Sequence, residues 1–293
     1  MVNEKNVLKV KNVEKTYSDF KLNDISFSLP EGYIMGLVGP NGAGKTTIIK
    51  MILDLINKES GEIAVFGKDN KKHRTEILQN IGVVFDTHCF MDEWKAKEIN
   101  QIYKWFYPQW NGFKFEKYLE KFEISKKKCI KDMSKGMQMK LMIACALSYN
   151  AKFLILDEPT SGLDPIARDE LIDILGKYVE DGEHSVLFST HITEDLEKIA
   201  DYITYLYKGN LIYSGDKMGF LEKYLKVKGD YSVLTAEMRE AVIGIRHYGE
   251  SFEGMIEINK KDLFNDFYTE AVTIEDVVVF MGRKNYEGHL ECN

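Results

Sequence analysis

The sequence predicts an α/β fold with a parallel β-sheet at its centre, and three observations support this. Patterns typical of strands and helices alternate along the first two thirds of the chain. Two short, mainly apolar runs, Phe153–Leu156 and Ser185–Ser189, are typical of strands that are covered on both faces. The glycine-rich segment Gly39–Thr46 lies between an apolar run and a helical pattern, which is the strand–loop–helix setting of a phosphate-binding loop.

The N-terminal part alternates in the manner of half-buried antiparallel strands. This pattern covers Val7–Val10 and Ile25–Leu29, and further strands are expected at Ile63–Gly67 and Ile81–Phe85. Residues 94–122 are rich in aromatic side chains and mainly helical in period, with a break at Pro108. Further helices are expected at 136–149, 171–179 and 193–200.

The sequence pattern changes after Gly215, and no further phosphate-binding motif follows. Strands are expected at Tyr231–Leu234 and Met255–Ile258, followed by a helix at Ile274–Met281. We therefore expect two domains, 1–215 and 216–293, the second a small α+β appendage.

Composition is that of an ordinary globular protein, with 44% hydrophobic and 29% charged residues. The net charge of −7 argues against nucleic acid as the main partner. The four cysteines form no Cys-x-x-Cys pair, which favours reduced thiols over zinc or disulfide roles. The N-terminus lacks the apolar core of a signal peptide, and no stretch reaches the length of a membrane span. These features predict a cytosolic protein.

The phosphate-binding loop predicts a nucleoside triphosphate as ligand. It reads Gly39, Pro40, Asn41, Gly42, Ala43, Gly44, Lys45 and Thr46, and Thr47 opens the helix. The glycines allow successive backbone N–H groups to surround an anion, and the helix N-terminus adds partial positive charge. Lys45 is expected to reach the outer phosphates and Thr46 to bind Mg²⁺.

Two adjacent carboxylates, Asp157 and Glu158, end the expected strand at 153–156. Neighbouring residues on an extended chain point in different directions. Asp157 is therefore expected to approach Mg²⁺, while Glu158 faces the terminal phosphate and polarises the attacking water. His191, at the end of the next apolar strand, is expected at the edge of the same site.

Together these motifs resemble the ATP-binding subunit of an ATP-binding cassette (ABC) transporter over roughly Val7 to Ser214. Ser161–Pro165, which includes Asp164, stands where that family has its D-loop, and His191 stands at its switch histidine. Tyr17 matches the aromatic residue that stacks on adenine. Met133–Met137 stands where the family has its Leu-Ser-Gly-Gly-Gln signature.

The chain departs from the family pattern at two places. The signature keeps Ser134 and Gly136 but has Lys135 for the first glycine and Met137 for the glutamine. The residue expected to be the Gln-loop glutamine is Asp86, which can still bind Mg²⁺ or water but is shorter and charged. Two outcomes are open. Either ATP hydrolysis remains coupled to the membrane partner, with an altered strength of coupling, or the turnover of ATP is weakened.

The resemblance implies a RecA-like core with an antiparallel β subdomain and a helical subdomain at about 87–150. It implies ATP and Mg²⁺ as cofactors, and hydrolysis of ATP between two head-to-tail subunits, in a homodimer or a heterodimer. A separate transmembrane permease is the implied partner, which places the subunit at the inner face of the cell membrane. A bacterial exporter of drugs or antimicrobial peptides fits best.

Three alternatives remain at this point: an importer ATPase, a soluble mechanical ATPase of the same superfamily, and a degenerate cassette that binds ATP without hydrolysing it. The aromatic residues of the helical subdomain have two interpretations as well. Each forms part of the core of that subdomain, or it belongs to a surface that docks on the membrane partner.

Overall fold

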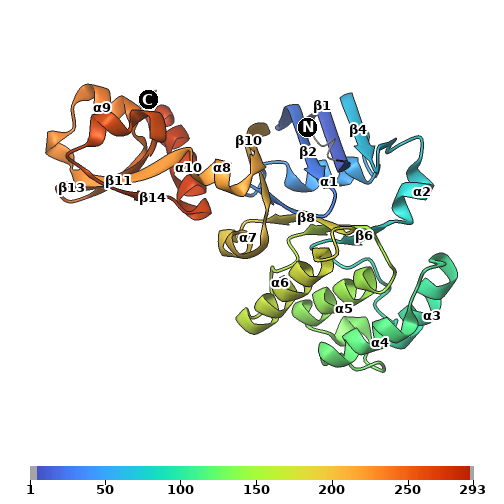
Figure 1. The fold of residues 1–293 in the computed structure, drawn as a ribbon. Helices are drawn as coiled ribbons and strands as arrows, with labels where there is room; N and C mark the ends of the chain where they lie inside the picture. Colours follow the sequence, from blue (N-terminus) through green and yellow to red (C-terminus); the bar gives the residue numbers. More distant parts are fainter. Residues whose placement is uncertain (1–4, 291–293) are drawn as a thin grey trace. The chain divides into compact units, whose positions relative to one another are not determined.

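The computed structural model describes residues 5–290, of which 284–290 by backbone alone. The chain forms two compact units, whose elements are labelled in Figure 1. Unit 1 consists of Met1–His191 and Thr204–Ile212, and unit 2 of Ile192–Ile203 and Tyr213–Asn293.

Unit 1 is built on a sheet of ten strands in the order β5-β4-β1-β2-β10-β9-β3-β8-β7-β6. The strands β3, β8, β7 and β6 pair in parallel, whereas β1 pairs antiparallel with both β2 and β4. The predicted α/β fold with an antiparallel subdomain is therefore confirmed. The strands are β1 (Asn6–Thr16), β2 (Lys21–Pro30), β3 (Ile34–Val38), β4 (Ser60–Val65), β5 (Lys68–Asp69), β6 (Ile81–Val84), β7 (Phe153–Asp157), β8 (Ser185–Thr190), β9 (Tyr202–Tyr207) and β10 (Asn210–Asp216).

Helices lie on both faces of the parallel strands, with α1 on one side and α5 and α6 on the other (Figure 1). The parallel strands β3, β7 and β8 are buried along their whole length, as their continuous apolar runs predict. The helices of unit 1 are α1 (Lys45–Ile52), α2 (Arg74–Leu78), α3 (Ala96–Phe106), α4 (Gly112–Lys121), the 3₁₀ turn η1 (Ile130–Asp132), α5 (Lys135–Leu147) and α6 (Pro165–Val179). The expected break at Pro108 falls between α3 and α4.

The aromatic residues of α3 and α4 divide into an inner and an outer set. Tyr103 stacks on Tyr107 and contacts Trp110, with ring centroids 5.3 and 4.9 Å apart. Tyr107 stacks on Tyr149, and the Tyr149 hydroxyl donates to the carbonyl of Ile81 on β6. An outer set of three, described below, is exposed to solvent. The core interpretation therefore holds for the inner set, and docking of the outer set on the membrane partner stays a prediction.

Unit 2 contains a separate antiparallel sheet in the order β12-β13-β11-β14. Phe252, Phe264 and Val227 are among the buried residues of its core. Its elements are α7 (Thr193–Ile199), α8 (Lys217–Leu221), β11 (Tyr224–Asp230), the 3₁₀ turn η2 (Tyr231–Val233), α9 (Ala236–Ala241), β12 (Ile243–Tyr248), β13 (Ser251–Glu257), the 3₁₀ helix η3 (Ile258–Phe264), β14 (Tyr268–Ala271) and α10 (Ile274–Leu290).

The expected strand at Tyr231–Leu234 is wrong, because Tyr231–Val233 forms a 3₁₀ turn. The side chain of Asp230 accepts hydrogen bonds from the backbone N–H of Ser232 at 2.8 Å and from its hydroxyl at 2.7 Å. Such local side-chain bonds favour a turn over an extended strand. The strand instead precedes this turn, as β11, and the expected strand at Met255–Ile258 ends one residue early at Glu257.

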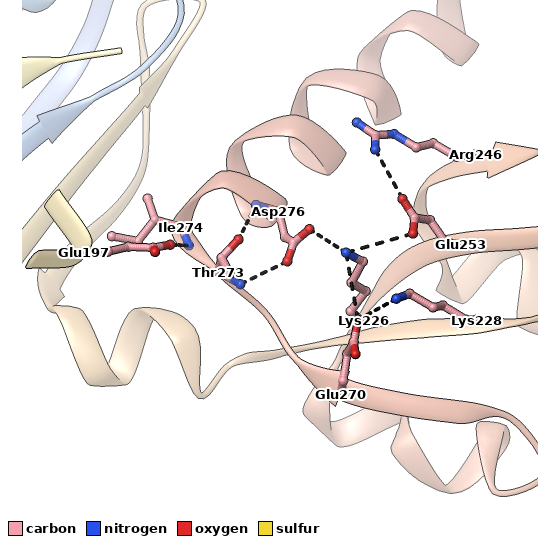
Figure 2. Close-up of polar contacts among 9 residues, drawn as sticks. All are labelled: Glu197, Lys226, Lys228, Arg246, Glu253, Glu270, Thr273, Ile274 and Asp276. Atoms are coloured by element: carbon pink, nitrogen blue, oxygen red, sulfur yellow. Dashed lines mark hydrogen bonds and ion pairs between the residues drawn. The ribbon is translucent and has the colours of Figure 1, made fainter. Parts of the chain in front are cut away.

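A network of charged side chains lies inside unit 2 (Figure 2). The ammonium of Lys226 is 2.9 Å from Asp276 and 3.9 Å from both Glu253 and Glu270. The Lys226 side chain is only 16% exposed, so water screens these charges weakly. The network links the first turn of α10 to β11, β13 and β14.

No helix within residues 5–290 combines the length and the apolar character needed to cross a membrane.

Candidate functional site

The phosphate-binding loop joins β3 to α1 and wraps around its own lysine. Lys45, the first residue of α1, is only 7% exposed. Its ammonium donates to the carbonyl of Gly39 at 2.8 Å and lies 3.4 Å from that of Pro40. The side chain is thus held with its charge at the loop rather than in solvent.

Gly44 precedes α1 in a conformation that other residues adopt only under strain. Its φ is +106°, in the left-handed region. A Cβ atom at this position would lie 2.5 Å from Cδ2 of Leu22 and 2.9 Å from Cζ of Phe20. The glycine therefore lets the loop pack against β2 while its N–H groups stay available to an anion.

Asp157 ends β7 and is almost completely buried, at 1% exposure. The Thr46 hydroxyl donates to its Oδ2 at 2.7 Å, and the Ser189 hydroxyl donates to its Oδ1 at 2.5 Å. Because β3, β8 and β7 are neighbours in the sheet, residues that follow or end them meet at one edge. Thr46 and Asp157, both expected to bind Mg²⁺, therefore lie side by side, and their binding of the metal stays a prediction.

Glu158, the next residue, has a φ of +53°, which is uncommon for a residue other than glycine. Its backbone N–H donates to both the hydroxyl and the carbonyl oxygen of Ser189, each at 3.1 Å. The carboxylate lies between two basic side chains: Oε1 is 3.4 Å from the Lys45 ammonium, and Oε2 is 2.6 Å from Nδ1 of His191. Asp157 and Glu158 therefore have different partners, but a left-handed turn at Glu158, rather than the expected extended chain, separates them.

A hollow of about 420 Å³ elsewhere in unit 1 lies around Phe66 and Lys152, and its lining includes neither Lys45, Thr46, Asp157, Glu158 nor His191. The hollow at the loop itself measures about 530 Å³. It is lined by Asp19, Phe20, Asn41, Gly42, Ala43, Gly44, Lys45, Thr46, Thr47, Asp86 and Glu158. The structure thus brings most of the predicted loop residues together with Asp86 and Glu158. Gly39, Pro40, Asp157 and His191 lie outside this lining but are bonded to residues within it.

Tyr17 does not line the hollow, and its assignment to adenine stays a prediction. Its side chain is 44% exposed, with the Lys15 ammonium 5.6 Å from the ring centroid. The backbone N–H of Tyr17 donates to the carbonyl of Phe20, and this tight turn places Phe20 against the loop.

Thr46 and Asp157 offer the hard oxygen ligands that Mg²⁺ prefers, one hydroxyl and one carboxylate side by side. Within the described part of the chain, no group of three His, Cys, Asp or Glu side chains can hold a metal ion on its own. The two residues fit a cation that takes its other ligands from phosphate and water. Asp86, two residues beyond β6, is exposed and accepts a 3.4 Å hydrogen bond from the Thr87 hydroxyl.

Ser134, Gly136 and Asp164 belong to a second hollow, of about 540 Å³, rather than to the first. Its lining comprises Phe122, Glu123, Ser134, Lys135, Gly136, Met137, Lys140, Gly162, Leu163 and Asp164. Ser134 is the N-cap of α5 and Asp164 that of α6. The pKa of Asp164 is lowered because the backbone N–H groups of Ala167 and Ile166 donate to its carboxylate.

Close packing of two glycines holds this second group together. A Cβ atom at Gly136 would lie 3.1 Å from the carbonyl oxygen of Gly162. A Cβ atom at Gly162, whose φ is +83°, would meet the stem of Lys135 at 3.5 Å. The signature segment and the D-loop segment are therefore in contact, and Lys135 packs along the latter.

The sequence did not predict three residues here. Asp19 and Phe20 line the first hollow, and Ser189 hydrogen-bonds to Asp157 and Glu158. Ser189 was predicted only as the end of a strand, yet it bonds both Asp157 and Glu158. A hydroxyl residue at the end of a buried strand, two positions before His191, was the available signal. Asp19 and Phe20 carry no comparable signal, because the turn that places them depends on the register of β1 with β2.

Comparison with known proteins agrees with this geometry. The family model described as "ABC transporter" matches residues 22–161. The chain is 34% identical to the bacitracin transport ATP-binding protein BcrA of Enterococcus faecalis, over 70% of this chain and 68% of that one. It is 32% identical to the lantibiotic transport ATP-binding protein SrtF of Streptococcus pyogenes, over 70% of this chain and 89% of that one. A solved ATP-binding subunit of an ABC transporter superposes with a TM-score of 0.66 at 26% identity, covering 73% of this chain and 91% of that one.

Proposed function

This chain belongs to the ATP-binding proteins of ABC transporters, and from that membership we propose that it works as half of a dimer that closes around ATP and drives export through a separate membrane protein. The observation that carries this proposal is the position of Glu158. Its carboxylate lines the hollow of the phosphate-binding loop, between Lys45 and His191.

Glu158 acts in this proposal as the general base. A carboxylate within reach of the terminal phosphate can orient a water molecule and accept its proton. The 2.6 Å contact to His191 fixes the orientation of the carboxylate, while the buried Asp157 nearby is hydrogen-bonded to Thr46 and Ser189 instead.

The loop binds the triphosphate through its N–H groups and Lys45. Thr46 and Asp157 would hold Mg²⁺, which would supply positive charge against the phosphate oxygens. Asp86 lies at the side of the same hollow, where it affects the local negative charge. Tyr17 or Phe20 contacts the base.

The second hollow supports the dimer. Ser134 and Gly136 stand at the N-terminus of α5, but in a hollow whose lining contains no residue of the phosphate-binding loop. In a head-to-tail pair, this helix N-terminus would meet the phosphates bound by the other subunit and supply further positive potential. Lys135 adds a full positive charge there. The pair is either two copies of this chain or this chain with a related subunit.

The names of the relatives, which describe bacitracin and lantibiotic transport, support export as the proposed direction. We infer that the cargo is a peptide-like antimicrobial compound or drug. The chain would act at the cytoplasmic face of the cell membrane, bound to its permease. The alternative is an importer. Identifying the permease that co-purifies with this chain would distinguish an importer from an exporter.

Replacing Glu158 by Gln tests the proposal. The amide keeps the shape of the side chain but cannot accept the proton, so ATP hydrolysis should fall about 10²–10⁴-fold. MgATP should still bind, and a closed dimer should accumulate in size-exclusion chromatography with ATP. Lys45→Ala is the control, since it should lose affinity for MgATP itself.

Unchanged turnover in the Glu158→Gln protein would remove this residue from the role of base. A monomer at saturating ATP in both the variant and the wild type would contradict the dimer.

A further inference from the structure

The helical region of unit 1 differs in charge from the rest of the chain. Residues 95–140 contain twelve lysines and five acidic residues, while the whole chain carries a net charge of −7. Among the residues that the structure describes, Lys126 is the one lysine of this stretch in an ion pair, with Glu116 and Glu120. The remaining lysines add a positive potential to this region.

Three large aromatic side chains project from the same region into solvent. Trp105 is 88% exposed, Phe106 73% and Phe113 68%. They lie at the C-terminal end of α3 and the N-terminal end of α4. Because Tyr103 and Tyr107 pack inward one turn apart, the helix must present the positions between them on its outer side.

We name the exposed aromatic residues, with two neighbouring lysines, the α3–α4 edge: Lys104, Trp105 and Phe106 at the end of α3, and Phe113 and Lys117 near the start of α4. Lys104 and Phe113 line a common hollow of about 630 Å³ between the two helices. The Lys117 ammonium lies over the ring of Phe113, 4.7 Å from its centroid. The ring of Phe113 is thus close to two cations, Lys104 and Lys117.

We propose that the α3–α4 edge binds directly to the surface of an anionic lipid bilayer. Tryptophan and phenylalanine insert at the level of the headgroups, while lysines are attracted to anionic lipids, each by about 1 kcal/mol, or roughly fivefold in affinity. A protein partner fits this composition less well, because the core of a protein–protein interface is depleted of lysine. The excess of lysines over acidic residues in this stretch favours a negatively charged binding surface.

This contact adds a lipid surface to the proposed function and does not depend on it. None of the five residues lines the hollow of the phosphate-binding loop or the hollow around Ser134. Loss of lipid binding is therefore separable from loss of ATP binding or hydrolysis.

The test is co-sedimentation of the full chain with vesicles. One set contains phosphatidylcholine alone, and the other contains phosphatidylglycerol as about a third of the lipid. Wild-type protein should bind the anionic vesicles and should be released as salt rises from about 0.1 M to about 1 M. Lys104→Gln with Lys117→Gln should weaken binding about 30-fold, and Trp105→Ala with Phe106→Ala at least tenfold.

The matched control is Tyr248→Ala with Tyr268→Ala, two aromatic residues of unit 2 that are also exposed, at 59% and 63%. This variant should bind vesicles as the wild type does, and all variants should keep wild-type affinity for MgATP. Equal binding to neutral and anionic vesicles, or equal loss in the control, would overturn the proposal. Failure of the wild type to bind vesicles, with the edge needed only for capture of the permease, would assign this surface to a protein instead.

Discussion

Ser189 hydrogen-bonds to both acidic residues of the site, to the carboxylate of Asp157 and to the backbone N–H of Glu158, although its own side chain carries no charge. Its hydroxyl donates to Asp157 at 2.5 Å and accepts from the backbone N–H of Glu158 at 3.1 Å. It therefore fixes the orientation of Asp157 toward Thr46 and supports the left-handed turn at Glu158. We regard it as a positioning residue.

Replacing Ser189 by Ala should lower ATP hydrolysis more than ATP binding. The buried carboxylate of Asp157 loses one donor, which costs about 1–3 kcal/mol. We expect turnover to fall about tenfold or more and the Mg²⁺ concentration needed for half-maximal activity to rise. Steady-state kinetics over a Mg²⁺ titration measures both quantities.

Ser185→Ala is the control, because Ser185 is equally buried at the other end of β8 and accepts from the N–H of Gly32 at 2.9 Å. It should destabilise the protein to a similar degree without a change in the Mg²⁺ dependence. A Mg²⁺ dependence shifted equally in both variants would reduce Ser189 to a purely structural role.

Asp86 is exposed at the side of the hollow, and its one described hydrogen bond is with the adjacent Thr87. Asp86→Gln removes a negative charge near the triphosphate, so MgATP affinity should stay the same or rise slightly, by about twofold. The stimulation of hydrolysis by the permease should change, because the loop that follows Asp86 leads into the helical region. The measurement compares ATPase rates of the two proteins alone and reconstituted with the partner; identical stimulation ratios would leave Asp86 a solvated loop carboxylate.

At the scale of elements, the start of α10 depends on a charged anchor (Figure 2). Thr273 and Asp276 cap the helix reciprocally: the N–H of Thr273 donates to Asp276 at 3.1 Å, and the N–H of Asp276 donates to the Thr273 hydroxyl at 3.0 Å. The Glu197 carboxylate of α7 accepts from the N–H of Ile274 at 2.8 Å. Burial alone would raise the pKa of Asp276, but the bonds from Lys226 and Thr273 leave it lowered.

A carboxylate whose pKa is lower in the folded state stabilises the fold above its unfolded pKa, and that contribution is lost as the pH falls through the lowered value. Asp276 should therefore contribute fully above about pH 4 and progressively less below it. Asp276→Asn should cost about 1–3 kcal/mol of unfolding free energy at pH 7 and much less at low pH. Urea unfolding, combined with hydrogen exchange of α10, measures this at both pH values.

Glu270→Gln is the comparison, because Glu270 is more exposed, at 34%, and its pairs with lysine are better screened. An equal loss of stability at pH 7 and below pH 3 in the Asp276→Asn protein would refute the linkage.

At the scale of the whole molecule, the parts that the sequence predicts are those determined by local pattern. The phosphate-binding loop and the pair Asp157 and Glu158 follow buried apolar strands, and parallel pairing brings such strand ends to one edge. The position of Phe20 instead of Tyr17 at the hollow depends on a turn and on strand register, which a single sequence does not determine.

Unit 2 was harder to predict because charged residues alternate with apolar ones in an inner strand of its sheet. β11 carries Lys226 and Lys228 in the middle of the sheet, and their charges are balanced by carboxylates on the neighbouring strands and on α10. The sequence of a lysine-rich strand predicts a surface segment, because the carboxylates that pair with its lysines across the sheet are not evident from the sequence. The neighbouring Tyr231–Val233 has high strand propensity, but Asp230 makes it a turn.

The strand order of unit 1 also constrains folding of the protein during its synthesis on the ribosome. β3, which leads into the phosphate-binding loop, pairs with β8, whose last residue is Thr190. At a synthesis rate of about 5–20 residues per second, the loop therefore waits roughly 8–30 s for the strand that completes its site. Until then, its apolar strands lack their partners and are open to capture by chaperones. Nucleotide binding by a nascent chain would thus report that this long-range pairing has formed.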